Sequence, residues 1–295
     1  MDVQPLVSVR TVTYNQEKYI AACLEGILMQ HTDFPFEVIV GEHSSSDRTQ
    51  EIVLAYQAKY PEKIHALITG RDAKVMENAI RTQQACRGKY QALCEGDDYW
   101  IDPLKLQKQV DFLESHPDVT MCFTNAIAIK EDIFGARLYF ASAIKPVMAF
   151  EEACGMAVPT ATVMARREVF DTLPDWRVNI LWSGDRLLLL WSAHLGKLGY
   201  LSDITAVYRR LGSGMSDQRR YLYKERLSEF SYIYQEFDKS THYEHTNEIQ
   251  ELLEQRKEKL KQDQMGAFYF LLHPRRGFRK LKDLYLGAKR HRFVF

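Results

Sequence analysis

The first hundred residues alternate between short β-branched stretches and segments with apolar residues at helical spacing. Strand patterns occupy residues 7–12, 36–40, 64–68 and 90–94. The clearest of the intervening helices has an apolar face with spacing i, i+3, i+4, i+7 and i+8, formed by Ile20, Cys23, Leu24, Ile27 and Leu28. Strands that alternate with helices of this length predict a parallel sheet with right-handed crossovers. Such a sheet binds its ligands at the carboxyl ends of its strands.

The alternation continues less regularly after residue 100. We predict a helix over residues 104–113 and strands over 119–124 and 200–208. Residues 184–195 are apolar on nearly every side, which predicts a deeply buried helix. Between residues 125 and 180 the pattern is irregular.

The loop at residues 211–214 contains two glycines and is the best candidate for a domain boundary. We therefore expect an α/β domain over residues 1–212 and a helical region over 213–295. Within that region, residues 275–292 carry eight Lys or Arg against one Asp, with Phe, Tyr and Leu between them. A basic amphipathic helix of this type either lies on an anionic membrane surface or packs on the catalytic domain with a solvated face. The sequence leaves both interpretations open.

Charge and cysteine content narrow the class of protein. Lys plus Arg is 39 and Asp plus Glu is 39, and this neutral total does not support a nucleic-acid binder. The apolar fraction of 46% is enough for a sizeable core. The five cysteines are odd in number and form no C-x-x-C pair, which suits a reducing compartment. Because the N-terminus lacks a signal-peptide pattern, we expect a cytosolic protein.

Two adjacent carboxylates, Asp97 and Asp98, directly follow the predicted strand at 90–94. Such a pair can hold a hard divalent cation, and Mg²⁺ prefers one or two carboxylates plus substrate phosphates. A sugar nucleotide supplies those phosphates. The alternative is a solvated acidic turn in which Asp98 caps the helix near Pro103. The position after a fourth strand, with two aromatic residues behind it, favours the metal site.

Two other turns follow predicted strands. In the first, Thr13 precedes Tyr14, whose ring can stack on a nucleobase. In the second, Glu42, His43 and Ser45 can contact a base and a ribose. The alternatives are an ordinary strand-to-helix turn with Asn15 as N-cap, and a serine that caps the following helix.

Asp185 stands at the start of the buried segment at 184–195. In a cleft, such a carboxylate can have a raised pKa and act as a general base, and the alternative is an N-cap. No two of the nine histidines stand at metal-ligand spacing, so we interpret His194 as a packed or rim histidine. The chain has no Ser-His-Asp signature, Walker loop or G-x-G-x-x-G.

Taken together, these sites resemble the family 2 glycosyltransferases. The resemblance is carried, in order, by VSVRTVTYN, VIVGEHSSSDRT, ACRGKYQALCEGDDYW and DPLKLQKQVDFL. It is close over residues 5–125 and looser as far as Arg209. It implies a GT-A nucleotide-diphospho-sugar transferase fold, with a mostly parallel central sheet flanked by helices. It also implies an inverting transfer of a sugar from a nucleotide-sugar donor to a saccharide or lipid-linked acceptor in bacterial surface polysaccharide biosynthesis. Contact of residues 275–292 with the membrane would place such a cytosolic protein at the inner face of the cell membrane.

The resemblance assigns a role to each site. Asp98 would ligate Mg²⁺ or Mn²⁺, Asp97 would contact the ribose or the metal, and Asp185 would be the base. The Tyr208-Arg209 pair resembles the dipeptide that ends the catalytic domain. The nucleotide sugar would contact Thr13, Tyr14, Glu42, His43, Ser45 and Asp97.

Three positions depart from the family pattern. His43 replaces the acid that accepts a hydrogen bond from uracil N3. Glu77 replaces a basic residue near the third helix, and Leu211 replaces a histidine two residues after the final arginine. Lys74 or Arg81 can supply the missing basic group. The departures leave the donor base open, and they motivate the alternative of a non-catalytic nucleotide-sugar-binding protein of the same fold. A nucleotidyltransferase would carry a glycine-rich phosphate loop after the first strand, which the sequence lacks.

Overall fold

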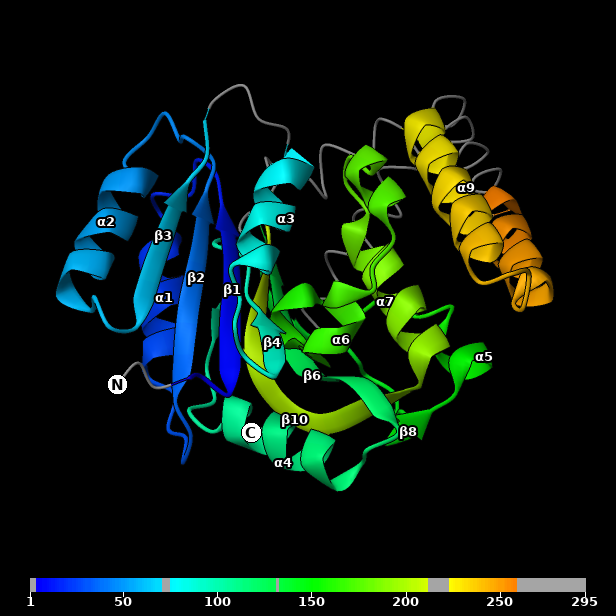
Figure 1. Cartoon of the computed structure of the whole chain (residues 1–295), viewed down its shortest axis with the longest axis horizontal. Helices are drawn as coiled ribbons and strands as arrows, with labels where there is room; N and C mark the ends of the chain where they lie inside the picture. Colours follow the sequence, from blue (N-terminus) through cyan, green and yellow to red (C-terminus); the bar gives the residue numbers. More distant parts are fainter. Residues whose placement is uncertain (1–3, 71–74, 131–132, 212–222, 259–295) are drawn as a thin grey trace. The chain divides into compact units, whose positions relative to one another are not determined.

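The computed structural model describes residues 4–70, 75–130, 133–211 and 223–258. The chain forms two compact units, Met1–Glu248 and Ile249–Phe295. All the strands and the named helices discussed below belong to the first unit (Figure 1). The predicted boundary around residue 212 and the basic segment at 275–292 lie outside the described residues.

The first unit is built on a ten-stranded sheet whose first half is parallel. It contains β1 (Val7–Thr13), β2 (Phe36–Glu42), β3 (Ile64–Ile68) and β4 (Tyr90–Leu93), in the spatial order β3-β2-β1-β4. Each neighbouring pair in this half is parallel. The four strands predicted from the alternating pattern are therefore confirmed.

Three helices connect these strands and cover both faces of the sheet. Helices α1 (Ile20–Leu28) and α2 (Thr49–Lys59) lie on one face, and α3 (Val75–Gln84) lies on the other (Figure 1). The chain steps outward from β1 to β3 and then returns past β1 to β4. Because right-handed crossovers in opposite directions place their helices on opposite faces, this order of strands dictates the layers. The predicted apolar face of α1 is buried at Ile20, Cys23, Leu24 and Ile27.

The second half of the sheet is mixed. Strand β9 (Val163–Arg166) inserts antiparallel between β4 and β6 (Val119–Lys130), and β10 (Lys197–Arg210) runs parallel to β6. The sheet ends at β5 (Tyr99–Trp100), antiparallel to β10. Two further antiparallel strands are β7 (Ile133–Leu138), beside β6, and β8 (Val147–Met148), beside β10. The irregular sequence pattern between 125 and 180 gave no sign of β9.

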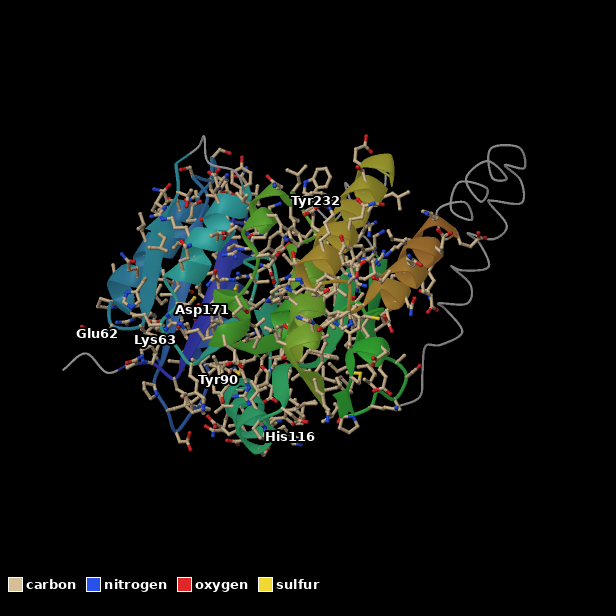
Figure 2. All side chains as sticks on the ribbon, turned by 45° about the vertical axis from the view of Figure 1, so that its right-hand side comes forward. Glu62, Lys63, Tyr90, His116, Asp171 and Tyr232 are labelled. Carbon is tan, nitrogen blue, oxygen red and sulfur yellow. The ribbon has the colours of Figure 1, made fainter. Side chains whose placement is uncertain are left out.

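Further helices pack around this second half. They include α4 (Lys105–Ser115), α5 (Phe150–Ala153), α6 (Arg167–Asp171) and α7 (Gly184–Leu195), with 3₁₀ turns η1 (Thr160–Thr162) and η2 (Asp175–Asn179), while α9 (Tyr223–Ser240) packs on α7. Helix α7 has the predicted bounds and is buried from Arg186 to Ala193. Turn η2 contacts α9 through Trp176, whose ring meets the ring of Tyr232 edge-on at 5.8 Å (Tyr232 is labelled in Figure 2).

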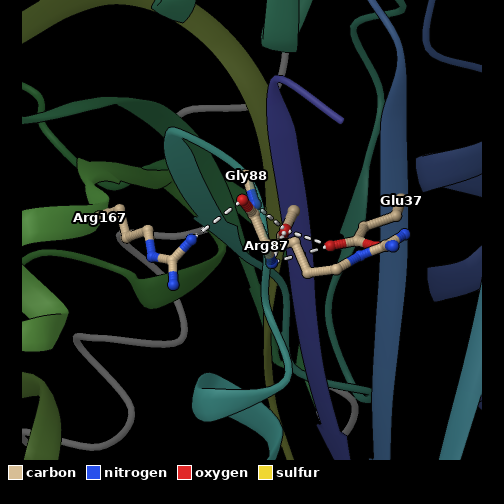
Figure 3. Close-up of polar contacts among 5 residues, drawn as sticks. Glu37, Arg87, Gly88 and Arg167 are labelled. Carbon is tan, nitrogen blue, oxygen red and sulfur yellow. Dashed lines mark hydrogen bonds and ion pairs between the residues drawn. The ribbon is translucent and has the colours of Figure 1, made fainter. Parts of the chain in front are cut away.

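A buried polar network fixes the start of β4 against β1 and β2 (Figure 3). The Ser8 hydroxyl donates to Glu37 Oε1 over 2.6 Å, and the Arg87 guanidinium donates twice to Glu37 Oε2 over 2.8 and 3.0 Å. The Gly88 N–H donates to Ser8 Oγ. A Cβ atom on Gly88 would lie 2.6 Å from the Ser8 nitrogen, so this close approach requires glycine. Arg167 adds a bond to the Arg87 carbonyl oxygen.

Two further features concern the cysteines and the helices. All five cysteines are buried and unbridged, as expected for small apolar residues in a core. Across the part of the chain that the structure describes, no helix combines the length and the apolarity that crossing a bilayer requires.

Candidate active site

The carboxyl ends of β1 and β2 meet the loop that follows β4. Thr13 and Glu42, the last residues of β1 and β2, are paired in the sheet. The loop after β4 runs alongside, and its Gly96 N–H donates to the Val12 carbonyl oxygen over 3.0 Å. A Cβ atom on Gly96 would lie 2.5 Å from Gln16 Oε1 and 2.7 Å from Thr13 Oγ1. The three predicted turns therefore gather at one edge of the sheet, as the parallel topology requires.

The first two turns form a polar surface beside an exposed aromatic ring. Tyr14 is 54% exposed. Its ring meets the His43 ring edge-on, with 5.6 Å between the ring centroids. Glu42 is fully buried, and its Oε1 accepts from the Ser45 N–H over 2.8 Å. Glu42 Oε2 and His43 Nδ1 are buried and have no hydrogen-bond partner among the described residues. An exposed ring next to unsatisfied buried polar atoms suits a planar ligand that forms hydrogen bonds.

Both predicted helix caps in these turns are wrong. Asn15 does not cap α1: it has a left-handed φ of 51°, and its Oδ1 accepts from the Ser46 N–H across the gap between the turns. At α2, Asp47 Oδ1 accepts from the Thr49 N–H in place of a serine. Ser45 Oγ instead accepts from the Asn15 N–H. The short polar side chains of the two turns thus hold one turn against the other.

The two aspartates of the third turn are anchored by the last strand. Asp98 is 2% exposed, and its Oδ1 accepts from the Arg209 N–H over 2.7 Å. The Arg209 guanidinium donates to the Asp97 carbonyl oxygen over 2.7 Å. The alternative in which Asp98 caps the next helix is wrong, because Asp102 Oδ1 accepts from the Leu104 N–H there.

Burial and repulsion make the ionised form of this acidic turn costly. Burial, followed by the charges of Asp97 and Glu95, raises the pKa of Asp98 well above its usual value. Burial also raises the pKa of Asp97, against the opposing effects of Arg209 and a hydrogen bond from Gln16. A divalent cation would remove this penalty, and carboxylate oxygens are the ligands that Mg²⁺ and Mn²⁺ prefer. The residues present therefore fit such an ion.

Asp185 connects to the aspartate pair through aromatic residues. The pKa of Tyr139 is raised by burial and, to a smaller extent, by the charge of Asp185, so the two side chains lie within electrostatic range. The ring of Tyr139 meets that of Tyr208 edge-on at 5.9 Å. Tyr208 directly precedes Arg209, which binds Asp98. A series of neighbouring residues thus runs from Asp185 through Tyr139 and Tyr208 to Arg209, which binds Asp98.

The segment that leads to Asp185 is held by a carboxylate from α9. Glu229 Oε1 accepts from the N–H groups of Leu181 and Trp182 over 2.7 and 2.8 Å, and its Oε2 accepts from the Ser183 hydroxyl over 2.9 Å. Asp185 is the second residue of α7 and follows the N-cap Ser183, so the N-cap alternative is wrong. No sequence pattern marks Glu229, because its partners lie more than 45 residues earlier.

Two surface hollows of about 480 and 880 Å³ lie at the opposite edge of the sheet, where the strands begin. Glu62 and Lys63, labelled in Figure 2, line both of them. Neither hollow contains a residue predicted for the site. The candidate site is therefore defined by converging polar groups rather than by either hollow.

The sequence matches known proteins over most of its length. The family model of glycosyl transferase family 2 matches residues 8–173, which is more than half of the chain. The uncharacterized protein Rv1520 of Mycobacterium tuberculosis (strain ATCC 25618 / H37Rv) is 36% identical over 227 residues. That match covers 73% of this chain and 63% of the relative, so the chain spans less than two thirds of the length of that protein.

Two solved structures share the fold. S. aureus TarS 1–349 in complex with UDP-GlcNAc matches with a TM-score of 0.57 at 18% identity, covering 77% of this chain and 65% of that TarS fragment. The mannosyltransferase PcManGT from Pyrobaculum calidifontis, in complex with GDP-Man and Mn²⁺, matches with a TM-score of 0.58 at 17% identity, covering 97% and 86%. The chain belongs to glycosyl transferase family 2 and has the GT-A fold of these enzymes.

Proposed function

We propose that this chain is a metal-dependent, inverting glycosyltransferase that transfers a sugar from a nucleotide sugar to a saccharide or lipid-linked acceptor. The observation that carries the proposal is the convergence of three strand-end turns on one edge of the sheet. That edge holds the exposed ring of Tyr14, the unsatisfied Glu42 Oε2 and the buried Asp98 carboxylate.

The first two turns bind the nucleoside of the donor. Tyr14 stacks on the base, while Glu42, His43 and Ser45 contact the base and the ribose, with Thr13 beneath them. Stacking suits an exposed ring because every base offers a π-face. The neighbours TarS and PcManGT carry UDP-GlcNAc and GDP-Man, so the fold accommodates either base. His43 offers one ring nitrogen in place of a carboxylate, and this leaves the choice of base to experiment.

Asp97 and Asp98 would hold Mg²⁺ or Mn²⁺ beside the diphosphate of the donor. A bound ion would supply positive charge to offset the charge that develops on the departing nucleoside diphosphate. Arg209 keeps the Asp98 carboxylate in place through its backbone N–H, and Gln16 orients Asp97 by a hydrogen bond. A preorganised pair of this kind needs little rearrangement as charge develops.

Asp185 is the general base. The acceptor hydroxyl oxygen forms a bond to the anomeric carbon, the bond from that carbon to the phosphate oxygen breaks, and the hydroxyl proton passes to the Asp185 carboxylate. Attack on the face opposite the leaving group inverts the anomeric centre. Glu229 holds the backbone before Asp185, which limits how far the base can move.

The proposed class of acceptor is inferred from the activities of related proteins. TarS of Staphylococcus aureus is a poly(ribitol-phosphate) beta-N-acetylglucosaminyltransferase, and its acceptor is thus a phosphate-rich polymer. A saccharide or lipid-linked acceptor in bacterial surface polysaccharide biosynthesis suits a chain of the same family. The basic segment at 275–292 would bring the enzyme to such an acceptor at an anionic membrane surface.

The proposal is tested by metal-dependent release of nucleoside diphosphate from a panel of UDP-, GDP- and dTDP-sugars. A thermal-shift screen of nucleoside diphosphates with and without Mn²⁺ first selects the base. Asp98→Asn should abolish release, and Asp185→Asn should lower it by about 100-fold or more while nucleotide binding persists. Asp171→Asn, at the exposed end of α6, is the matched control (Figure 2).

Unchanged release in both Asp98→Asn and Asp185→Asn would defeat the proposed mechanism. Metal-dependent binding of a nucleoside diphosphate, with no release from any donor, would instead support a non-catalytic nucleotide-sugar-binding protein. That alternative draws on His43, Glu77 and Leu211, the three departures from the family pattern.

A further inference from the structure

Three metal-ligand side chains meet at the C-terminal end of α7. His194 Nδ1 lies 3.0 Å from His245 Nε2 and 3.5 Å from a Glu244 carboxylate oxygen. One ligand atom from each of the three residues lies within 4.8 Å of the other two. His194 stands nine residues along α7 from Asp185, which is about 13 Å at the rise of an α-helix. The cluster is therefore separate from the proposed catalytic site.

The turn after α9 is built to present Glu244 and His245 to α7. His242 and Tyr243 both have left-handed backbone conformations, with φ of 53° and 66°. Non-glycine residues adopt this conformation at a cost, so the surroundings must hold it. The Tyr243 N–H donates to the Asp238 carbonyl oxygen over 2.8 Å, which closes the turn.

Apolar rings fix the two imidazoles. The His245 ring stacks on Phe150 with 3.7 Å between centroids, and Phe237 lies 5.8 Å from His245 and 5.9 Å from Phe150. Trp191 and Phe237 lie 5.7 and 6.2 Å from the His194 ring. An apolar shell of this kind restricts the ligands to one orientation and limits the access of water.

The two separations from His194 Nδ1 are close to those of a tetrahedral site, and all three donor atoms lie within 4.8 Å of one another. With zinc–nitrogen bonds near 2.0–2.1 Å, two ligand atoms on one ion lie about 3.3 Å apart. The observed 3.0 and 3.5 Å lie on either side of that value. A hydrogen bond between the two imidazoles accounts for the 3.0 Å contact alone, whereas one shared ion accounts for both contacts.

We propose that His194, Glu244 and His245 bind a Zn²⁺ ion, with water in the fourth position. Two imidazoles and one carboxylate form a ligand set that zinc accepts. The ion ties the end of α7 to the turn after α9. Since Glu229 of α9 already holds the segment before α7, both ends of the helix that carries Asp185 are then fixed to the α9 region.

The experiment titrates Zn²⁺, and Co²⁺ as its spectroscopic substitute, into the full chain carrying Asp97→Asn and Asp98→Asn. This background removes the proposed catalytic metal site, so the two sites are tested separately. One equivalent of Co²⁺ should give the intense visible absorption of tetrahedral coordination. Zn²⁺ at a hundredfold excess over Kd should raise Tm by about 5 °C.

The variants His194→Gln and His245→Gln should abolish the Co²⁺ spectrum and the Zn²⁺ shift in Tm. Glu244 is exposed, so Glu244→Gln tests the site without affecting the core and should weaken Zn²⁺ binding at least tenfold. His242→Gln is the matched control from the same turn and should bind Zn²⁺ as tightly as the background protein with Asp97→Asn and Asp98→Asn does. No tetrahedral Co²⁺ spectrum in the background protein, or equal Zn²⁺ affinity in Glu244→Gln and His242→Gln, would overturn the proposal.

Discussion

Replacing Lys105 with methionine should change how stability depends on pH, in a direction that the structure fixes. Lys105 begins α4 and is fully buried, with Nζ 4.2 Å from the centroid of the Trp100 ring. Its ammonium group donates to Gln109 Oε1 over 2.5 Å. Burial lowers the pKa of Lys105 from 10.5 to about 8. The folded protein thus holds this proton less tightly than the unfolded chain does.

The sign follows from proton counting. Between pH 8 and 10.5 the unfolded chain binds more protons at this lysine, so its contribution to the free energy of unfolding rises with pH. Below pH 8 the buried charge of Lys105 lowers the free energy of unfolding by nearly the full amount, which is about 3 kcal/mol for the cited pKa shift. This amount falls to about 2 kcal/mol at pH 9 and about 1 kcal/mol at pH 10. Lys105→Met should therefore gain stability over the wild type most at pH 7, and the gain should shrink by about 2 kcal/mol by pH 10.

Urea denaturation at pH 7, 8, 9 and 10, under reducing conditions, measures this difference. Subtracting the wild type cancels the buried thiol of Cys86, whose pKa is raised to about 12 and which destabilises both proteins above pH 9. Lys105→Met also loses the hydrogen bond to Gln109. This loss changes the free energy of unfolding by the same amount at every pH, because a neutral lysine also forms the bond.

Lys108→Met is the matched control for Lys105→Met. Hydrogen bonds to Asp102 and Asp203 raise the pKa of Lys108, so this lysine stays charged up to pH 10. The difference in the free energy of unfolding between Lys108→Met and the wild type should therefore not vary with pH. A difference for Lys105→Met that does not vary with pH would refute the reasoning.

Three further substitutions test the scaffold of the site. Glu229→Ala leaves three donors around Ser183, one of them buried and two partly buried, without their acceptor and should cost about 3 kcal/mol in urea denaturation, with a smaller loss in Glu229→Gln. Gly96→Ala should lower stability by about 1–3 kcal/mol, since its methyl group would meet Thr13, whereas Gly135→Ala, which meets no described atom within 4 Å, should be nearly neutral. Tyr14→Ala should weaken nucleoside diphosphate binding about tenfold in calorimetry, and Tyr14→Phe should retain it.

The sequence was sufficient for the first four strands, for α7 and for the edge of the sheet on which the strands place the site. Periodicity located the first four strands and both ends of α7, because each segment buries one consistent face or is buried all round. Parallel topology then brings the carboxyl ends of these strands together, which is why Tyr14, Glu42 and Asp98 could be grouped in advance.

What the sequence missed depends on partners far along the chain. Strand β9 is only four residues long and entirely within the sheet, so it shows no alternation. Arg209 reaches Asp98 from 111 residues away. The misassigned cap at Asn15 has the same origin, since its side chain serves the facing turn rather than its own helix. His194 was expected to be a packed or rim histidine, and its contact with His245 depends on the turn after α9.

The position of Asp185 depends on parts of the chain outside the family match. Residues 8–173 contain the strand-end turns and the aspartate pair, while Asp185 and all its supports from α9 lie beyond them. If Asp185 is the base, a change in α9 should act on proton transfer and leave the nucleotide site intact. Glu229→Gln should thus lower kcat while the KM for the donor stays within about twofold, because binding and proton transfer rest on different elements. An equal change in both parameters would mean that α9 supports the whole site and not the base alone.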